Sequence, residues 1–484
     1  MFGVACGDDD EEEERPKGTC TIGDASSCKD GLECQAVAGS EPKCFCSNDR
    51  DTGCDKDLGL VCELIEGGNS GCFAPVSVEG RVFDLGTDAP IEGALVVARD
   101  ANFAADSGVA VSGPDGKYSL RVRVPRNAEG VPRAKDVTLR ADAMGYLTFP
   151  SAPRIALPVA LDSASGDPLV VVGAATDIGM LPLASSTGLG SISGKVLSDA
   201  PRGTLVVAGG TAGQGGGVTG VADFDGSYTV FNVPAGTVAV SGYKQGLQLV
   251  PTTAAVVASE NTAGIDLATA DRATSTVTGK VDIVNPGAGK DTSVILVVSE
   301  TFVPNAARGE APPGLRAWPV SGAFSISGVP DGNYVVLAAF ENDFLVRDPD
   351  TAIGGTAIVE ITVAGDTAMP QSFKVTGALD VVSPDREQVV SGTPRFIWVD
   401  DSGEESYQLV VFDAYGTKIW EHLSLPKVTG SKNVEVDYGT AGGSPETAPA
   451  LTPGMLYQFR AMSIKQGGTP ISKTEDLRGT FVYQ

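Results

Sequence analysis

Short runs of alternating apolar and polar residues recur along most of the chain, and glycine or proline separates them. Alternation places every second side chain on one face of a strand, which is the pattern of a half-buried β-sheet. The run Tyr407-Gln408-Leu409-Val410-Val411 is a clear example. No stretch of 18 apolar residues occurs, so the sequence predicts no membrane-spanning helix. The pattern predicts an all-β fold.

One order of elements occurs three times between residues 76 and 377. Each copy opens with an apolar-x-Gly-basic-Val strand, continues with a β-branched strand, and then has a turn that precedes an aromatic strand. Recurrence of the whole order, rather than of one short motif, predicts three copies of a single β-module. The openings are residues 78–82, 192–196 and 277–281.

Glycine occupies the turn of each copy, at Gly116, Gly226 and Gly322, and aspartate precedes it in the first two. Because glycine adopts the positive φ that a tight two-residue turn requires, Asp-Gly between alternating strands predicts a β-hairpin. The next aromatic residue and the residue two positions later share one face of a strand, so we expect both in the core. These pairs are Tyr118 and Leu120, Tyr228 and Val230, and Phe324 and Ile326.

This recurring order resembles the carboxypeptidase regulatory-like module, which implies a transthyretin-like sandwich of seven strands. The resemblance covers about 300 residues. In carboxypeptidases the module accompanies a zinc peptidase domain and carries none of its metal ligands. Because this chain contains one histidine, the resemblance does not imply peptidase activity. Modules of this kind are also similar to starch-binding sandwiches.

After Ser383 the pattern changes over about the last 100 residues. Phe396 and Trp398 fit an early core strand, and a Pro-Gly turn ending at Gly454 precedes a strand with Tyr457. This arrangement resembles the tyrosine corner of a fibronectin type III domain, in which the hydroxyl bonds back to the chain. An immunoglobulin-like sandwich of another type is the alternative.

Eight of the nine cysteines lie between residues 20 and 72, in two sets of four with similar spacing. Short segments with few apolar residues cannot build a core and need covalent cross-links. Two disulfides in each set, each worth about 2–4 kcal/mol, would supply them, but four cysteines allow three connectivities. The sets are Cys20, Cys28, Cys34 and Cys44, and Cys46, Cys54, Cys62 and Cys72.

Metal binding is the competing interpretation of this segment. Zinc sites usually contain closely paired C-x2-C ligands, whereas the one close cysteine pair here falls at the junction between the two sets. We therefore expect disulfides and no metal ligands. An acidic run could supply oxygen ligands to Ca²⁺, but it lacks the EF-hand order, so we favour a solvated loop. The run contains Asp49, Asp51, Asp55 and Asp57.

Cys6 follows small residues and precedes an acidic run from Asp8 to Glu14. This arrangement resembles the lipobox and tether of a bacterial lipoprotein, whose cysteine becomes the acylated N-terminus, and it implies attachment to a membrane through lipid. Gly3 stands where that family usually has leucine, and the five residues before Cys6 are too few for a signal region. We therefore expect the natural start site upstream. A cytosolic tail with a free thiol is the alternative.

The formal net charge of −26 affects the expected partners. A polyanion repels phosphate backbones and anionic lipid headgroups, so we expect no nucleic-acid binding and no electrostatic attachment to membranes. Divalent cations and basic partners remain open.

Candidate catalytic residues are scarce. His422 is the only histidine and no nucleophile motif lies near it, so we expect an exposed or hairpin histidine and no Ser-His-Asp site. The glycine-rich segment 213–217 lacks the Lys-Ser/Thr pair and the helix of a P-loop, and we expect a flexible loop. These observations predict a protein that is not an enzyme, with no catalytic residues and no cofactor.

Together these patterns predict a multi-domain string of transthyretin- and immunoglobulin-like β-sandwiches after a disulfide-rich module. The leading functional interpretation is a non-catalytic lipoprotein of the outer membrane or cell surface, for adhesion, interaction or envelope assembly. The alternative is carbohydrate binding, with Trp318 as the aromatic platform and a polysaccharide as partner. The expected segments are a tether at 1–17, a cysteine-rich module at 18–75, regulatory-like domains at 76–187, 188–272 and 273–377, and a fibronectin type III-like domain at 378–484.

Overall fold

The computed structural model describes residues 20–22, 27–28, 32–37, 40–47, 52–55, 60–284, 291–341, 358–468 and 470–484. Strands dominate this part of the chain, which confirms the all-β prediction. Its 3-10 helices are single turns, and none of the helices there has the length and apolar character needed to cross a membrane. They include η2 (Leu161–Ser163), η3 (Ala174–Thr176), η4 (Ser299–Thr301) and η5 (Pro304–Ala306).

The N-terminal head, defined as the described residues within 20–73, contains two antiparallel hairpins. Its eight cysteines form four disulfides, as the composition predicts. In both sets the first cysteine pairs with the third and the second with the fourth, so the four-cysteine module is used twice. The bonds are Cys20–Cys34, Cys28–Cys44, Cys46–Cys62 and Cys54–Cys72. The hairpin strands are β1 (Glu33–Val37), β2 (Ser40–Phe45), β3 (Val61–Leu64) and β4 (Ser70–Phe73).

The first sandwich faces a sheet in the order β10-β9-β6-β7 against a sheet in which β5 pairs with β8, β11 and β12. Between the sheets lies a continuous apolar core that includes Val78, Val96, Leu120 and Leu139. The strands are β5 (Val76–Asp84), β6 (Leu95–Arg99), β7 (Ala110–Val111), β8 (Lys117–Val122), β9 (Asp136–Asp142), β10 (Val159–Ala160), β11 (Val170–Val171) and β12 (Ile178–Met180).

The second and third sandwiches repeat this strand order. In each, the first strand pairs antiparallel with the fourth and parallel with the last, and the second strand lies between the third and the fifth. The second has β13 (Leu189–Leu197), β14 (Leu205–Ala208), β15 (Val218–Val221), β16 (Ser227–Pro234), β17 (Gly236–Tyr243), β18 (Thr252–Val256), β19 (Asn261–Thr262) and β20 (Leu267–Ala268). The third has β21 (Ser275–Val284), β22 (Asp291–Val298), β23 (Arg316–Val320), β24 (Ala323–Val329), β25 (Gly332–Glu341), β26 (Val359–Val363), β27 (Thr367–Ala368) and β28 (Phe373–Thr376).

The aromatic residues of the three copies point into the cores, as predicted. Tyr118, Tyr228 and Phe324 are only 4–6% exposed, and the residues two positions later are buried on the same face. The hydroxyl of Tyr118 donates to the carbonyl of Thr176 at 2.6 Å, and that of Tyr228 donates to the carbonyl of Ile265. Each tyrosine therefore fills the core and also holds the end of its sandwich.

The predicted hairpin at these turns is wrong. Gly116 and Gly226 adopt the expected positive φ of 75° and 82°, so the turns themselves form. However, the strand before each turn pairs within one sheet and the strand after it pairs within the other, as with β7 and β8. The Asp-Gly turn reverses the chain but does not determine which strand pairs with the next one. After the turn, β8 buries its apolar face in the core and pairs with β5.

The fourth sandwich packs a sheet of β29, β31 and β34 against one in the order β30-β37-β35-β32-β33, with β36 beside β35. Phe396 and Trp398 on β31 are fully buried, as expected. The backbone N–H of Thr452 donates to the hydroxyl oxygen of Tyr457 at 2.8 Å, the bond back to the chain that the sequence predicts. The strands are β29 (Val381–Ser383), β30 (Gln388–Val390), β31 (Arg395–Val399), β32 (Ser406–Asp413), β33 (Lys418–Pro426), β34 (Asn433–Asp437), β35 (Leu456–Ile464), β36 (Pro470–Lys473) and β37 (Thr480–Tyr483).

Replacing Tyr457 with phenylalanine is expected to lower the free energy of unfolding by about 1–1.5 kcal/mol, because the N–H of Thr452 loses its acceptor. Urea-induced unfolding measures the difference. Tyr483→Phe is the matched control, since Tyr483 lies beside the same core and no hydrogen bond of its hydroxyl is found within the described residues. Equal losses in the two variants would contradict the role of the Tyr457 bond.

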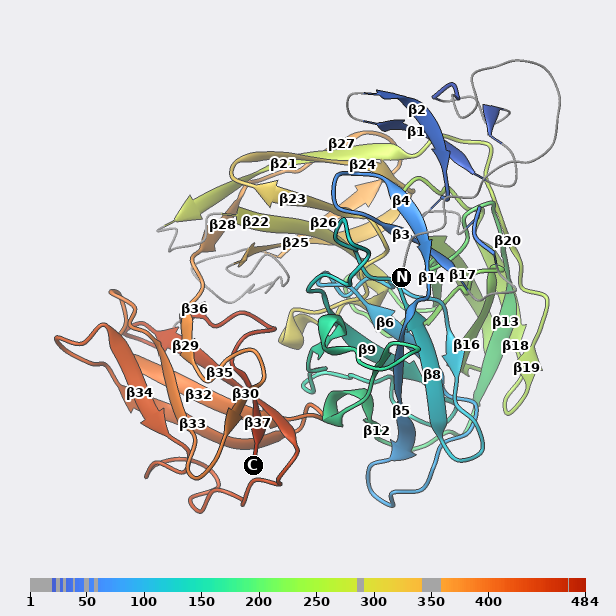
Figure 1. The fold of residues 1–484 in the computed structure, drawn as a ribbon. Coiled ribbons are helices and arrows are strands. Elements are labelled where there is room, and N and C mark those ends of the chain that lie inside the picture. The colour runs from blue at the N-terminus through green and yellow to red at the C-terminus, as the bar shows by residue number, and fades with distance from the viewer. Residues whose placement is uncertain are drawn as a thin grey trace.

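The four sandwiches pack against one another around a shared junction (Figure 1). The first lies between the second and the fourth, and the third lies across them. Tyr243 of the second sandwich packs within the core of the third, and the N–H of Gly246 donates to the carbonyl of Gly328 at 2.7 Å. Ile155 of the first forms an apolar cluster with Leu456 of the fourth. The sandwiches are thus joined by side-chain packing as well as by sequence.

Candidate functional site: a pocket between the sandwiches

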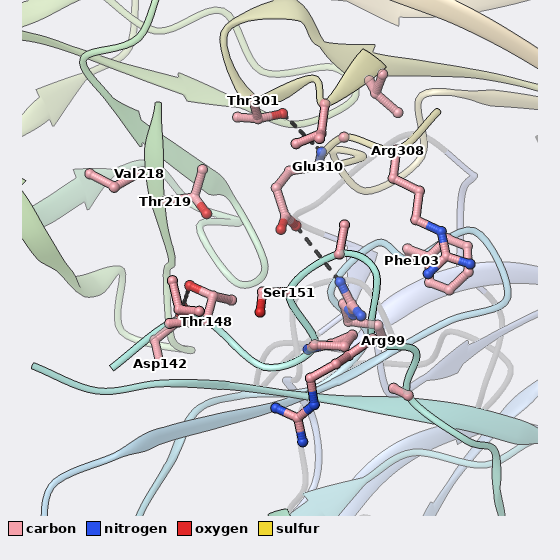
Figure 2. Close-up of a pocket in the computed structure, with 18 of the residues that line it drawn as sticks. Arg99, Phe103, Asp142, Thr148, Ser151, Val218, Thr219, Thr301, Arg308 and Glu310 are labelled. Carbon is pink, nitrogen blue, oxygen red and sulfur yellow. Dashed lines mark hydrogen bonds and ion pairs between the residues drawn. The ribbon is translucent and has the colours of Figure 1, made fainter. Parts of the chain in front are cut away.

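A pocket of about 410 Å³ lies where the four sandwiches meet. The segment after β9 of the first sandwich forms one wall, and residues 216–219 of the second form another. The remaining walls come from residues between 295 and 310 of the third sandwich and from Asp476 and Leu477 of the fourth (Figure 2). Its volume is in the range of small-molecule sites, which often form at domain interfaces.

Gly216 and Gly217 of the glycine-rich segment 213–217 line this wall, and the segment is a loop that hydrogen-bonds to the third sandwich. The N–H of Gly217 donates to the carbonyl of Glu300 at 2.8 Å, and the N–H of Gly213 donates to the hydroxyl of Ser299 at 2.6 Å. A Cβ atom added to Gly215 would lie 2.5 Å from the carbonyl oxygen of Phe302. Glycine is therefore needed here for close approach of two backbones and not for phosphate binding.

A single guanidinium joins three sandwiches behind the pocket. Arg140 of β9 is 1% exposed, and its Nε donates to Oδ2 of Asp142 at 2.7 Å. Its Nη1 lies 2.8 Å from Oε2 of Glu310 in the third sandwich, and its Nη2 donates to the hydroxyl of Thr219 in the second at 2.7 Å. Burial lowers the pKa of Arg140, but the two carboxylates raise it by more than this, so the net shift is upward and the group stays charged.

Arg99, at the end of β6, differs from Arg140 in having almost no polar partner. Its side chain is 8% exposed, its Nε is buried without a hydrogen bond, and its Nη1 lies 3.9 Å from Oε2 of Glu310. The ring of Phe103 is 5.4 Å from its guanidinium carbon. Burial lowers the pKa of Arg99 to about 10, so it is still protonated at neutral pH. Arg99 is a buried cation that lacks hydrogen-bond acceptors within the described residues.

Two further arginines line the pocket and have partners from other sandwiches. Nη2 of Arg154 donates to the carbonyl of Gly179 at 2.8 Å and to the carbonyl of Tyr415 in the fourth sandwich. Burial lowers the pKa of Arg154. Nη2 of Arg308 lies 3.7 Å from Oδ1 of Asp476. Arg154 and Arg308 therefore connect sandwiches. Nε of Arg154, like that of Arg99, is buried without a hydrogen bond, but Arg154 has two carbonyl acceptors and Arg99 has none within the described residues.

Trp318, which the sequence singled out, is not among the residues that line this pocket. Trp318 lies on the edge strand β23, is 37% exposed, and has the guanidinium of Arg316 5.8 Å from its ring. Asp55 is the one described member of the acidic run proposed for Ca²⁺, and Cys6 lies outside the described residues.

His422 lies in a hairpin, on β33, which is one of the two settings expected, and its ring is buried. The residue is 6% exposed. Its Nε2 lies 3.0 Å from the carbonyl of Ala441, and the N–H of Ser424 donates to Nδ1 at 3.4 Å. Because both ring nitrogens have backbone partners, His422 is not placed to act as a general base.

The pocket residues were missed because they lie far apart in the sequence. The one sequence feature that could have indicated them is the presence of charged residues within otherwise apolar strands. Arg99 ends a run of valines in β6, and Arg140 and Asp142 follow apolar residues of β9. No local feature indicates that Glu310, from the third copy, would meet them.

No family model and no curated protein matches the chain. Among solved structures, it is similar to a DUF3823 family protein from Bacteroides ovatus at 12% identity, over 43% of this chain and 98% of that one, with a TM-score of 0.22. It is also similar to a streptococcal ancillary pilin at 11% identity, over 61% and 98%, with a TM-score of 0.16. A tetra-tandem repeat from the extending region of a large adhesion protein matches at 16% identity, over 84% and 99%, with a TM-score of 0.13. At these TM-scores the likenesses carry no argument about function.

Proposed function

We propose that this chain is a non-catalytic, extracytoplasmic surface protein, held on a membrane by a lipid on Cys6, that serves adhesion or envelope assembly. Its repeats would be regulatory-like modules and its last sandwich a fibronectin type III-like module. The observation that carries the proposal is the repeated disulfide connectivity of the head. Such cross-links form and persist in oxidising compartments and are rare in the cytosol.

The attachment of the head to the first sandwich supports a role in presenting that head. Glu63 of β3 is fully buried, and its Oε2 lies 2.5 Å from Nε of Arg126 in the first sandwich. Nη2 of Arg126 also donates to the carbonyl of Ala74 at 2.8 Å, and its guanidinium lies 4.9 Å from the ring centre of Phe73. A head fixed in this way has a defined orientation relative to the sandwiches.

Peptide mapping of the protein exported by its own host, under non-reducing conditions, tests the compartment. We expect peptides joined in the first-to-third and second-to-fourth pattern in both cysteine sets. Free thiols at all eight positions in the exported protein would contradict an oxidising location.

Metabolic labelling with palmitate tests the membrane anchor. The wild-type protein is expected to incorporate label and to sediment with membranes, whereas a Cys6→Ser variant should do neither because it lacks the acylated thiol. A wild-type protein without label would rule out the lipoprotein part of the proposal and would leave the surface role to be explained by another anchor.

Carbohydrate binding is a second candidate function, favoured by one observation. Trp318 is partly exposed on an edge strand, where one face of an indole could stack against a sugar ring. A polysaccharide pull-down with the wild-type protein and a Trp318→Ala variant tests it. Binding that is lost in the variant supports the candidate, and absence of binding in both removes it.

A further inference from the structure

We propose that the interdomain pocket binds a small molecule that carries one carboxylate, and that Arg99 receives this carboxylate. The site is independent of the surface role proposed above, because it depends on the junction of the sandwiches and not on the head or the anchor.

The buried guanidinium of Arg99 offers hydrogen-bond donors to an anion in the pocket. A guanidinium carries several donors in a planar fork that matches the two oxygens of a carboxylate. Burial of such a charge is costly unless hydrogen bonds compensate it. Arg99 has only a distant carboxylate at 3.9 Å and the ring of Phe103. A ligand carboxylate would supply the acceptors that the described residues do not.

Glu310 cannot meet this need, because it is committed elsewhere. Its Oε2 lies 2.8 Å from Nη1 of Arg140, and its backbone N–H donates to the hydroxyl of Thr301 at 2.9 Å. These two bonds hold the carboxylate 3.9 Å from Nη1 of Arg99, an ion pair that a dashed line marks in Figure 2 and that is too long for a hydrogen bond. Glu310 therefore orients Arg99 electrostatically and leaves its donors for a ligand.

The local charge allows an anion to enter, despite the negative charge of the whole chain. Three arginines and three carboxylates line the pocket, and Arg140 lies behind it and pairs with two of these carboxylates. Charges further than about 10 Å away are largely screened at 0.1 M salt, so the local balance matters most. The groups are Arg99, Arg140, Arg154 and Arg308, with Asp142, Glu310 and Asp476.

The other walls define the body of the ligand. Ile295, Val297 and Leu337 of the third sandwich line the pocket and belong to a buried apolar cluster with Phe302. Apolar walls with a few fixed polar groups are typical of sites for small organic molecules. A compact apolar or partly apolar body attached to one carboxylate fits both the volume of the pocket and the guanidinium of Arg99.

Equilibrium dialysis of the full chain with phenylacetate and phenylacetamide tests the proposal. The two probes have nearly the same shape and differ in charge. We expect millimolar binding of phenylacetate, which is the affinity range for a ligand of this size, and at least tenfold weaker binding of phenylacetamide. Absence of phenylacetate binding, or equal binding of the two probes, would overturn the proposal.

Substitutions locate the binding. Arg99→Met is expected to weaken phenylacetate binding at least tenfold, and Arg99→Lys should retain part of it because the charge remains. Arg121→Met is the matched control, since Arg121 is exposed on β8 and its removal changes the net charge equally. If Arg121→Met weakens binding as much as Arg99→Met does, the effect is one of overall charge and the assignment to the pocket is wrong. Far-ultraviolet circular dichroism verifies that each variant is folded, and Arg99→Lys provides the test if Arg99→Met is not.

Discussion

An Arg126→Met variant is expected to unfold its head and first sandwich with a free energy about 3–5 kcal/mol lower than the wild type at neutral pH. Arg126 is 4% exposed and faces the fully buried Glu63, so its loss leaves a carboxylate without its counter-charge. Removing one partner of a buried ion pair typically costs this much. Guanidinium-induced unfolding followed by circular dichroism measures the change.

The deficit of this variant is also expected to depend on pH. Burial raises the pKa of Glu63 above its usual value of 4.5, and Arg126 opposes this shift in the wild type. Without Arg126, only the backbone N–H of Val124 and the charge of Lys135 still oppose the rise in the pKa of Glu63. A carboxyl group with a raised folded-state pKa makes its full contribution to the free energy of unfolding at pH values below its unfolded pKa. This contribution is lost as the pH rises through the folded-state pKa. The difference between variant and wild type should therefore grow as the pH rises above 4.5.

A Glu63→Gln/Arg126→Met double variant provides the control, because it contains no unpaired charge at this position. It should be more stable than Arg126→Met at neutral pH and should lose the pH dependence. A double variant that is no more stable than the single one would show that packing, and not the charge of Glu63, explains the loss.

Arg140→Met is expected to lower the stability of the interdomain junction by about 3–5 kcal/mol, since it leaves Asp142 and Glu310 buried without their main cation. Because Arg140 also holds Thr219 of the second sandwich, its loss should separate the unfolding of the sandwiches. Differential scanning calorimetry is expected to show more transitions for the variant than for the wild type.

The exposed Arg121 again provides a comparison at equal charge. Arg121→Met should unfold within about 0.5 kcal/mol of the wild type, as surface substitutions usually do. An Arg140→Met protein with the transition pattern and temperature of the wild type would show that apolar packing alone holds the junction.

The sequence predicts those features that depend on neighbouring residues. Alternation placed Tyr118, Tyr228 and Phe324 in their cores, because the two faces of a strand follow from a period of two. The resemblance of the turn before Tyr457 to a tyrosine corner implied the bond between its hydroxyl and the backbone. Clustering of eight cysteines predicted disulfides, although only the fold selects one of three connectivities for each set.

Features that depend on distant residues could not be predicted in this way. The Asp-Gly turn at Gly116 specifies a reversal but not the sheet to which the next strand belongs. The pocket brings Arg99 and Glu310 together from different copies of the module, and this contact depends on how whole sandwiches pack. A single sequence offers no signal for such long-range pairs.

The contacts of the first sandwich bear on how this protein can change during evolution. Chains of modules that touch only their sequence neighbours can gain or lose a unit and remain folded. Here the first sandwich contacts the second through Arg140, the third through the same side chain, and the fourth through Arg154. Recombination that deleted or duplicated one copy would place mismatched surfaces against one another. The number of copies is therefore constrained by the contacts that the first sandwich makes with the other three. We expect gain or loss of a copy to be rarer here than in extended arrays.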